Sequence, residues 1–130
     1  MQLPTRALTI KNPWAALIVS GTKDIENRSW PIRYRGWIFI HAGKTREDAE
    51  WEACRSLMRH AGIPLTPENG TSHYGGIVGI ARIVDCVTQH PSPWFTGPFG
   101  WVLGEARPVR FHPCRGAQGL WIPSYPYSIP

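Results

Sequence analysis

The alternation of apolar and polar residues predicts a strand, a short helix and a second strand in the first quarter of the chain. Residues 6–11 alternate as a strand does, with apolar side chains on one face. Asn12 suits a helix N-cap and Pro13 suits the first helical position. Apolar residues follow at helical spacing over 14–20, and Gly21 ends the helix as a C-terminal cap does.

The second strand carries an unusual concentration of charge. A regular strand over Lys23–Trp30 places Glu26 and Arg28 on one face and Lys23 on the other. The three side chains meet only if Lys23 lies in the bend that follows Gly21, before the strand alternation begins.

The next segment predicts the centre of the sheet and a longer helix. Trp37–Ala42 is apolar on both faces, which is typical of a central, buried strand, and it delivers His41 at its C-terminal end. Thr45 can cap a helix that runs to about His60, with acids in its first turns and basic residues in its last. The positions of this helix that we expect to be buried are Ala49, Trp51, Cys54, Leu57, Met58 and Ala61.

The remaining pattern predicts more short strands and no second domain. A loop over 62–74 precedes a strand over 75–87, whose glycines suggest a bulge, and a further strand over 99–109. A turn then leads to a last strand near Trp121, and 122–130 forms an extended tail on the surface. We therefore expect a mixed α+β, mainly β fold: one domain over 1–130, built as a small, nearly closed barrel of about six strands with two flanking helices.

Composition supports this architecture and narrows the class of protein. Thirteen glycines and thirteen prolines in 130 residues favour turns and short strands over a helical bundle. Three widely spaced cysteines without a Cys-x-x-Cys pair favour a reducing compartment and argue against structural zinc. No membrane-spanning run and no signal-peptide pattern is present, so we expect a cytoplasmic protein without metal or cofactor.

Charge is unevenly distributed along the chain. The net charge is +5, and residues 1–46 hold eight lysines and arginines but only two acids. This basic N-terminal third favours a polyanionic or phosphate-bearing partner.

The charged strand is the best candidate for chemistry. Lys23 and Arg28 can pair with a phosphate or a base carbonyl, and Glu26 can accept from an exocyclic amine. The structural alternative is an internal salt bridge. His41 can act as a base, an acid or a donor, or be a satisfied buried histidine. Tryptophans that can stack on a base, or simply fill the core, are Trp14, Trp94, Trp101 and Trp121; Trp37 and Trp51 are assigned to the core.

Four blocks in this order resemble a known family. They are Ile10-Lys-x-Pro-Trp14, Gly21-Thr-Lys-Asp-Ile-Glu-Asn-Arg28 followed by Trp30, the apolar strand ending in His41-Ala, and Gln118-Gly-Leu-Trp121. Over about residues 5–122 the chain resembles the ASCH domain family (activating signal cointegrator homology). The resemblance implies a PUA-like β-barrel with a cleft beside the first helix, and a link to RNA binding.

The same resemblance implies two possible activities. A few members of the family are enzymes, one branch hydrolysing N4-acylated cytidines and another acting as a ribonuclease. The amidohydrolase branch carries a threonine nucleophile three positions after its lysine. Here the lysine corresponds to Lys23, but the nucleophile position is Glu26. That mechanism is therefore not carried over.

The leading hypothesis is a domain that binds RNA, other single-stranded nucleic acid, or a modified nucleobase or nucleotide, as a monomer and away from membranes. The expected ligand-binding residues are Lys11, Pro13, Trp14, Lys23, Glu26, Arg28, His41, Lys44, Trp101 and Trp121. A basic surface for the nucleic-acid backbone comprises Arg6, Arg33, Arg35, Lys44 and Arg46.

Two alternatives remain open. A metal-independent ribonuclease or nucleoside amidohydrolase would use Lys23, Glu26 and His41 as its catalytic groups. A protein-interaction module would use Trp94-Phe95 and the Tyr-Pro tail as exposed anchors. The other histidines show no mutual spacing that suggests a metal site.

Overall fold

The computed structural model describes residues 1–64 and 73–130. Within them, the strands are β1 (Ala7–Ile10), β2 (Ile25–Arg28), β3 (Gly36–Ala42), β4 (Gly76–Val87), β5 (Phe99–Pro113) and β6 (Leu120–Trp121), and the helices are α1 (Trp14–Val19) and α2 (Asp48–Ala61).

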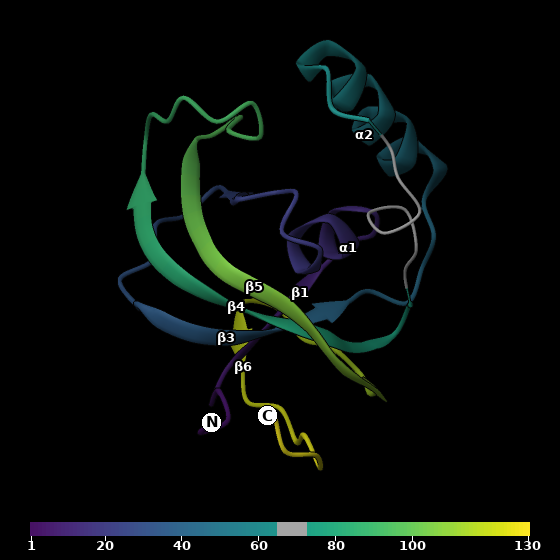
Figure 1. The fold of residues 1–130 in the computed structure, drawn as a ribbon, viewed down its shortest axis with the longest axis vertical. Coiled ribbons are helices and arrows are strands. Elements are labelled where there is room, and N and C mark those ends of the chain that lie inside the picture. The colour runs from purple at the N-terminus through teal and green to yellow at the C-terminus, as the bar shows by residue number, and fades with distance from the viewer. Residues whose placement is uncertain (65–72) are drawn as a thin grey trace.

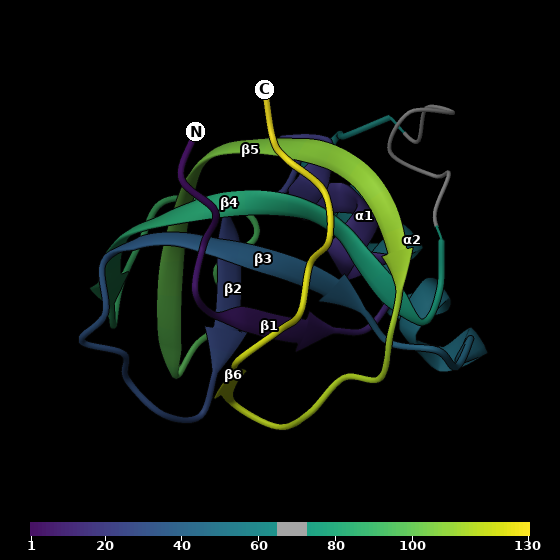
Figure 2. The same ribbon diagram turned by 90° about the horizontal axis from the view of Figure 1, so that it is seen from below.

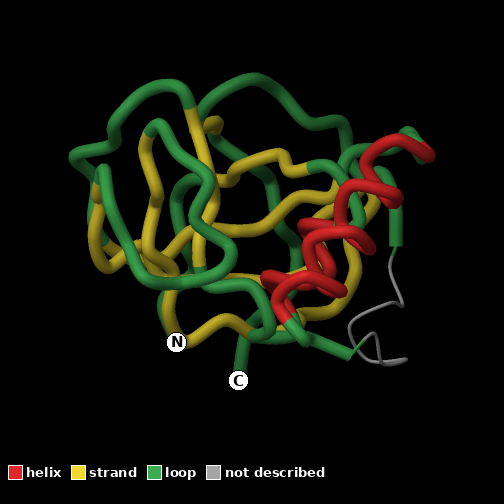
Figure 3. The backbone as a smooth tube through the Cα atoms, turned by 90° about the horizontal axis from the view of Figure 1, so that it is seen from above, coloured by secondary structure: helices red, strands yellow, loops and turns green. Residues whose placement is uncertain are grey.

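The described strands form one six-stranded sheet in the order β2-β5-β4-β3-β1-β6. Only the β1–β3 pairing is parallel. The long strands β4 and β5 bend strongly, so the sheet curls into a half-barrel with β2 and β6 at its edges (Figure 1). Both helices lie on the same side of this sheet (Figure 3). The expected mixed, mainly β fold is confirmed, although the sheet is an open curl and not a closed barrel.

Irregular register produces the curvature. The β4–β5 ladder shifts register at three places, and β3–β4 shifts between Ile40 and His41. Gly79 shows why a glycine stands on β4: a Cβ there would lie 2.5 Å from Cγ2 of Val19 and 2.7 Å from the carbonyl oxygen of Arg107. The missing side chain lets α1 pack directly on the sheet.

The two faces of the sheet carry separate cores. On β3, Ile38 and Ile40 point to the inner face, where they pack with α1, while Phe39 points to the outer face. Because β3 is covered on both faces, apolar residues are needed at successive positions, which explains its continuous apolar run. The prediction of a central buried strand is confirmed.

The C-terminal segment covers the outer face. The sequence predicts a surface tail over 122–130, whereas in the structure this segment crosses the sheet beside the N-terminal residues (Figure 2). Ile129 is only 4% exposed, and the ring of Tyr125 packs 4.8 Å from that of Phe39. The Tyr125 hydroxyl donates to the carbonyl oxygen of Arg110 at 2.7 Å, and the Met1 amino group donates to that of Ile129 at 3.0 Å. The tail is thus extended as expected, but Ile129 belongs to the outer core and Tyr125 packs against it, while alternate residues such as Ile122 stay exposed.

Several element boundaries differ from expectation. Helix α1 begins at Trp14 with Pro13 as its N-cap, and the Asn12 side chain instead accepts from the Ala16 amide at 3.2 Å. Helix α2 begins at Asp48, not directly after Thr45. Strand β5 continues to Pro113 because its pairing with β4 resumes at the far end.

Two further predictions concern the loop over 62–74 and the absence of a membrane-spanning segment. Within the expected loop over 62–74, residues 65–72 lie outside the described residues. No helix in the described ranges is long and apolar enough to cross a bilayer.

Candidate functional site

A cavity of about 1010 Å³ opens beside α1, between the edge strand β2, the end of β1 and the helix α2. Its walls come from five parts of the chain: β1, the α1–β2 region, α2, the loop before β5 and the turn before β6. The lining residues are Thr9, Ile10, Lys11, Trp14, Lys23, Glu26, Asn27, Arg28, Ser29, Trp30, Glu50, Ala53, Leu57, Trp94, Thr96, Ala117, Gln118 and Gly119.

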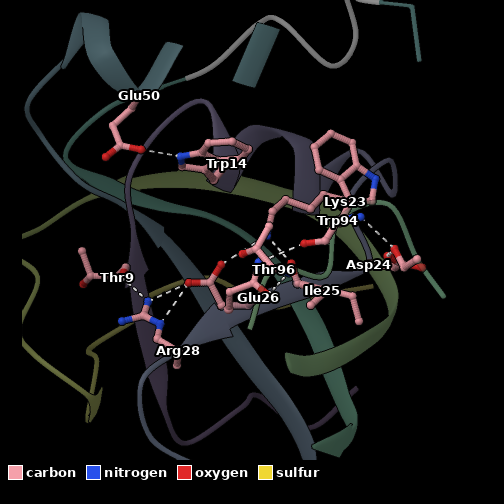
Figure 4. A network of polar contacts seen from close by, with 12 residues as sticks. Thr9, Trp14, Lys23, Asp24, Ile25, Glu26, Arg28, Glu50, Trp94 and Thr96 are labelled. Atoms are coloured by element: carbon pink, nitrogen blue, oxygen red, sulfur yellow. Dashed lines mark hydrogen bonds and ion pairs between the residues drawn. The ribbon is translucent and has the colours of Figure 1, made fainter. Parts of the chain in front are cut away.

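Three charged side chains, Lys23, Glu26 and Arg28, form a continuous network in this cavity, which we call the charged triad (Figure 4). Glu26 Oε1 lies 3.4 Å from Lys23 Nζ, and Glu26 Oε2 lies 2.9 Å from Arg28 Nη2 and 3.0 Å from Arg28 Nε. Lys23 is 4% exposed and Glu26 7%. Buried charges of this kind persist only when they are paired, and here one carboxylate serves two cations.

The local chain path explains how Lys23 reaches the other two charges. The amides of Thr22 and Lys23 both donate to the carbonyl oxygen of Leu17, at 3.0 Å each, so the chain turns back at the end of α1. Strand β2 begins only at Ile25. Lys23 therefore lies in the bend, as the sequence predicts for the case in which all three charges meet.

The charged triad also bonds to the main chain. Lys23 Nζ donates to the carbonyl oxygen of Ile25, and Arg28 Nη2 donates to that of Thr9 at 3.0 Å. These bonds fix both cations, but Arg28 Nη1 has no partner among the described residues. An ammonium group has three donors, so Lys23 also keeps one after its two contacts.

The electrostatics of the charged triad favour a ligand with electronegative groups. Burial lowers the pKa of Lys23 below its ordinary value of 10.5, and the Glu26 carboxylate opposes this shift. Two cations around one carboxylate leave a net positive charge in a poorly hydrated place. A carbonyl or phosphate oxygen is the complementary group.

Aromatic rings form the wall above the charged triad. Trp14 and Trp94 meet edge to face with their centroids 6.5 Å apart, and Lys23 Nζ lies 5.8 Å from the centroid of the Trp14 ring. Trp14 Nε1 donates to Glu50 Oε2 at 2.7 Å, which ties this ring to α2 (Figure 4). Trp14, at the first turn of α1, lies in the lining of the cavity.

Trp101 is not accessible to a ligand. It is 0% exposed and belongs to the inner core. The expectation that it stacks on a base is therefore wrong, because a strand-centred ring on the inner face is covered by its neighbours. It instead supports two residues of the cavity: Arg28 lies over its ring at 5.8 Å, and Trp30 packs against it edge to face at 4.6 Å.

His41 and Trp121 lie behind the cavity wall and do not line it. His41 is 2% exposed, and its Nε2 lies 2.8 Å from the carbonyl oxygen of Cys114. Since a carbonyl can only accept, Nε2 carries the proton, and in the neutral ring Nδ1 accepts from the Thr9 hydroxyl at 3.2 Å. Trp121 Nε1 donates to the same hydroxyl oxygen at 3.1 Å. His41 is thus the satisfied buried histidine that was the alternative to a ligand-binding one.

These contacts hold the turn that forms one rim of the cavity, residues 117–119. Gly116, just before it, has no room for a side chain: a Cβ would lie 2.5 Å from Thr9 Oγ1 and 2.7 Å from His41 Cε1. The rim is therefore docked closely onto β1 and β3.

The predicted basic residues divide between the mouth and the remote surface. Lys11 lines the mouth and pairs with Glu47 at 3.0 Å and Glu50 at 3.7 Å; its pKa is raised by the bond to Glu47. The other expected binding residues do not line the cavity: Pro13 is buried, and Lys44 and the surface set Arg6, Arg33, Arg35 and Arg46 lie elsewhere. Arg46, for example, lies over the ring of Trp51 at 4.4 Å and pairs with Asp48 at 3.2 Å.

Sequence reasoning missed several residues that shape the site. Asn27 ties β2 to the loop before β5: its Nδ2 donates to the carbonyl oxygen of Trp94 at 2.9 Å and its Oδ1 accepts from the Thr96 amide at 2.9 Å. Glu50 and Trp30 were also not expected. The signal for Trp30 was its place directly after the charged strand; Glu50 carries no signal beyond helical spacing with Ala53 and Leu57, which line the same wall. Nowhere in residues 1–64 and 73–130 do three or more His, Cys, Asp or Glu gather as metal ligands do.

Together, the fold and the cavity define a small, mainly β domain with a charged and aromatic ligand cavity beside its first helix. The chain belongs to the ASCH domain family, whose model matches residues 8–96. The matched part contains the charged triad, Trp14 and Trp94.

The chain is similar to a segment of activating signal cointegrator 1 from two mammals. It is 35% identical over 86 residues to human activating signal cointegrator 1 and 34% identical over 86 residues to the mouse protein of that name. Each match covers 63% of this chain but only 14% of the relative. The chain is thus similar to one segment of a much longer protein.

Proposed function

We propose that this domain binds RNA or another single-stranded nucleic acid by taking one base or nucleotide into the cavity. The observation that carries the proposal is the position of the charged triad against the Trp14–Trp94 wall. Trp14 is half-buried whereas Trp94 is only 3% exposed, so Trp14 is the ring on which a planar base can stack, and base–aromatic stacking contributes about 1–3 kcal/mol per base. The ASCH resemblance supports the same class of ligand.

The polar groups that remain open suit the edge of a base. Lys23 keeps one ammonium donor and Arg28 keeps Nη1, and both can pair with a carbonyl or phosphate oxygen. Each Glu26 oxygen faces a cation but has a second lone pair, so it can accept from an exocyclic amine. The charged triad therefore offers donors and acceptors side by side, as a base edge requires.

The test compares two arginine-to-glutamine substitutions, one inside the cavity and one outside it. We expect Arg28→Gln to weaken binding of a labelled single-stranded RNA about 10- to 100-fold, since charge-assisted bonds contribute about 1.5–3 kcal/mol. Arg82→Gln is the matched control, because Arg82 pairs with Glu105 at 3.1 Å on the exposed surface and does not line the cavity. Binding is measured by fluorescence anisotropy at two salt concentrations. The proposal is overturned if no RNA, single-stranded DNA or nucleotide binds, or if both variants behave alike.

One observation favours a second candidate, a metal-independent hydrolase acting on RNA or a nucleoside. A buried lysine with a lowered pKa is a better base or nucleophile than an ordinary one, and Lys23 has that property. The expected partner His41 does not line the cavity, which leaves Glu26 as the second catalytic group. Turnover by the purified protein, lost in Lys23→Ala, would establish this activity. Turnover that survives the substitution would point to another site or a contaminant.

A further inference from the structure

Trp30 lies at the edge of the cavity and is partly exposed to solvent. It lines the cavity, yet it is 38% exposed. All seven tryptophans are in the described part of the chain, and the other six are buried or half-buried. A tryptophan left exposed beside a polar cavity calls for a partner, since its large apolar area favours burial.

The exposed ring is nevertheless held in a defined position. Trp101 Nε1 donates to the carbonyl oxygen of Trp30 at 3.2 Å, which fixes its main chain. The two rings meet at 78°, with centroids 4.6 Å apart. An edge-to-face contact covers at most one face of a ring, so a flat face of Trp30 remains available. A platform that is already ordered loses little entropy when a ligand stacks on it.

Arg28 is held by the same buried ring. Its guanidinium carbon lies 5.8 Å from the Trp101 centroid, and its Nη1 has no partner among the described residues. Trp101 therefore sets the relative positions of the free guanidinium donor and the exposed ring of Trp30. The same cavity is therefore lined by the Trp14 and Trp94 rings, by a cation and by a further aromatic ring, Trp30.

The cavity is also larger than one base requires. Its volume of about 1010 Å³ lies at the upper end of the roughly 300–1,000 Å³ that is typical of small-molecule pockets. A ligand that fills it extends from the charged triad to the mouth.

We propose that Trp30 is a second base-stacking site, so that the ligand is a dinucleotide step of single-stranded nucleic acid. One base stacks on Trp14, the linking phosphate pairs with Arg28 Nη1, and the neighbouring base stacks on Trp30. This inference rests on the proposed function of the cavity. Nucleic acid is the matching occupant because it alternates planar bases with one phosphate per step, as the site alternates rings with a cation.

The test measures an affinity ratio, so that it separates this inference from the proposed function. Isothermal titration calorimetry is run with the four mononucleotides and the four matching homodinucleotides. We expect the best dinucleotide to bind roughly 5- to 150-fold more tightly than its mononucleotide, the factor that corresponds to about 1–3 kcal/mol of stacking. Trp30→Ala brings that ratio close to one, and Trp30→Tyr keeps most of it, because the ring is retained.

Tyr34→Ala is the control, since Tyr34 is an exposed aromatic residue, 36% accessible, that does not line the cavity; its ratio stays at the wild-type value. Equal affinities for mononucleotide and dinucleotide in the wild type overturn the second site but leave the first intact. A dinucleotide advantage that persists in Trp30→Ala overturns it too. Failure of all eight nucleotides to bind, or tighter binding of a poly-glutamate peptide, overturns both proposals.

Discussion

The two faces of the curled sheet are both buried, but different partners bury them. The outer face packs Phe39, Ile77 and Ile80 against the chain's own tail, through Tyr125 and Ile129. The inner face packs against α1, and the charged triad and the cavity lie beside this contact. The outer side is completed by apolar contacts from within the chain, whereas the inner side ends in groups that a further molecule can still contact.

This difference indicates how stability and recognition are divided. Apolar burial on the outer face contributes free energy of folding without any requirement for charge or a precise hydrogen-bond pattern. The charged triad contributes less to stability, because removing charges from water offsets much of their mutual attraction. The proposed function explains these residues by the ligand groups that they would contact.

The largest effect is expected from removing the tail. Truncation after Trp121 exposes the outer core, and loss of a buried isoleucine side chain alone costs about 2–5 kcal/mol. Since a domain has only about 5–15 kcal/mol of stability in total, we expect the truncated chain to lose its cooperative unfolding transition in urea. Ile129→Ala should lower the free energy of unfolding by about 2–5 kcal/mol. The control is Ile122→Ala, at a side chain that is 74% exposed, which should change it by less than about 0.5 kcal/mol. Equal, small effects of the two alanine variants would contradict the role given to the tail.

The next effect concerns the carboxylate of the charged triad. Glu26→Gln leaves Lys23 and Arg28 without their counter-charge, and we expect a loss of about 3 kcal/mol at pH 7, the low end for breaking a buried pair, because Arg28 is 24% exposed. The control is Glu105→Gln, whose partner Arg82 is on the surface, with an expected loss below about 1 kcal/mol.

This loss should depend on pH in a defined direction. The folded state releases the Lys23 proton at a lower pH than the unfolded chain does, so between the lowered pKa and 10.5 the unfolded chain binds more protons and stability rises with pH. Glu26→Gln removes the group that supports the charge and lowers the pKa of Lys23 further. The deficit of the variant should therefore shrink as the pH rises toward 10.5 in urea unfolding. A deficit that stays constant would show that the charge of Lys23 is not its cause.

The smallest effect is expected at the junction between the two faces. Thr9→Val keeps the shape of the side chain but removes the hydroxyl that bonds to His41 and Trp121, so we expect a loss of about 1–2 kcal/mol. RNA binding should weaken as well, because the rim 117–119 is docked through these bonds. Thr88→Val, at an exposed position, should change neither property. Unchanged RNA affinity in Thr9→Val would contradict a link between this network and the cavity.

Much of the fold could be predicted from the sequence because its signals are local. The apolar run of β3, the glycines of β4 and the helical spacing of α2 each report on their own surroundings. The extent of β5 could not be predicted, since its far end is held by β4 and contains prolines that usually end a strand. The packing of the tail depends on an outer face assembled from β1, β3 and β4, which no local pattern reveals.

The meeting of the three charges could be predicted because these residues are close in sequence. Lys23, Glu26 and Arg28 lie within six residues, so their meeting required only the correct bend. His41, Trp101 and Trp121 were placed less well, because a histidine or tryptophan at a strand end reads the same whether it faces a cavity or the core. Hydrogen bonds to residues far away in the chain decide whether such a side chain is buried. His41 on β3 bonds to the carbonyl oxygen of Cys114, and Trp101 on β5 bonds to that of Trp30.

The main-chain bonds of the charged triad have a consequence for self-association. An open sheet leaves unpaired carbonyl groups along its borders, and these can template the addition of a strand from another molecule. Lys23 occupies the carbonyl oxygen of Ile25 on β2, and Arg28 occupies that of Thr9 on β1 beyond its pairing with β6. A carbonyl oxygen that already accepts from a cation is less available to an amide of another molecule. Covering the neighbouring charge with an apolar strand would also be unfavourable. Lys23 and Arg28 thus leave two fewer free carbonyl groups at the opening of the half-barrel for a strand of another molecule to pair with.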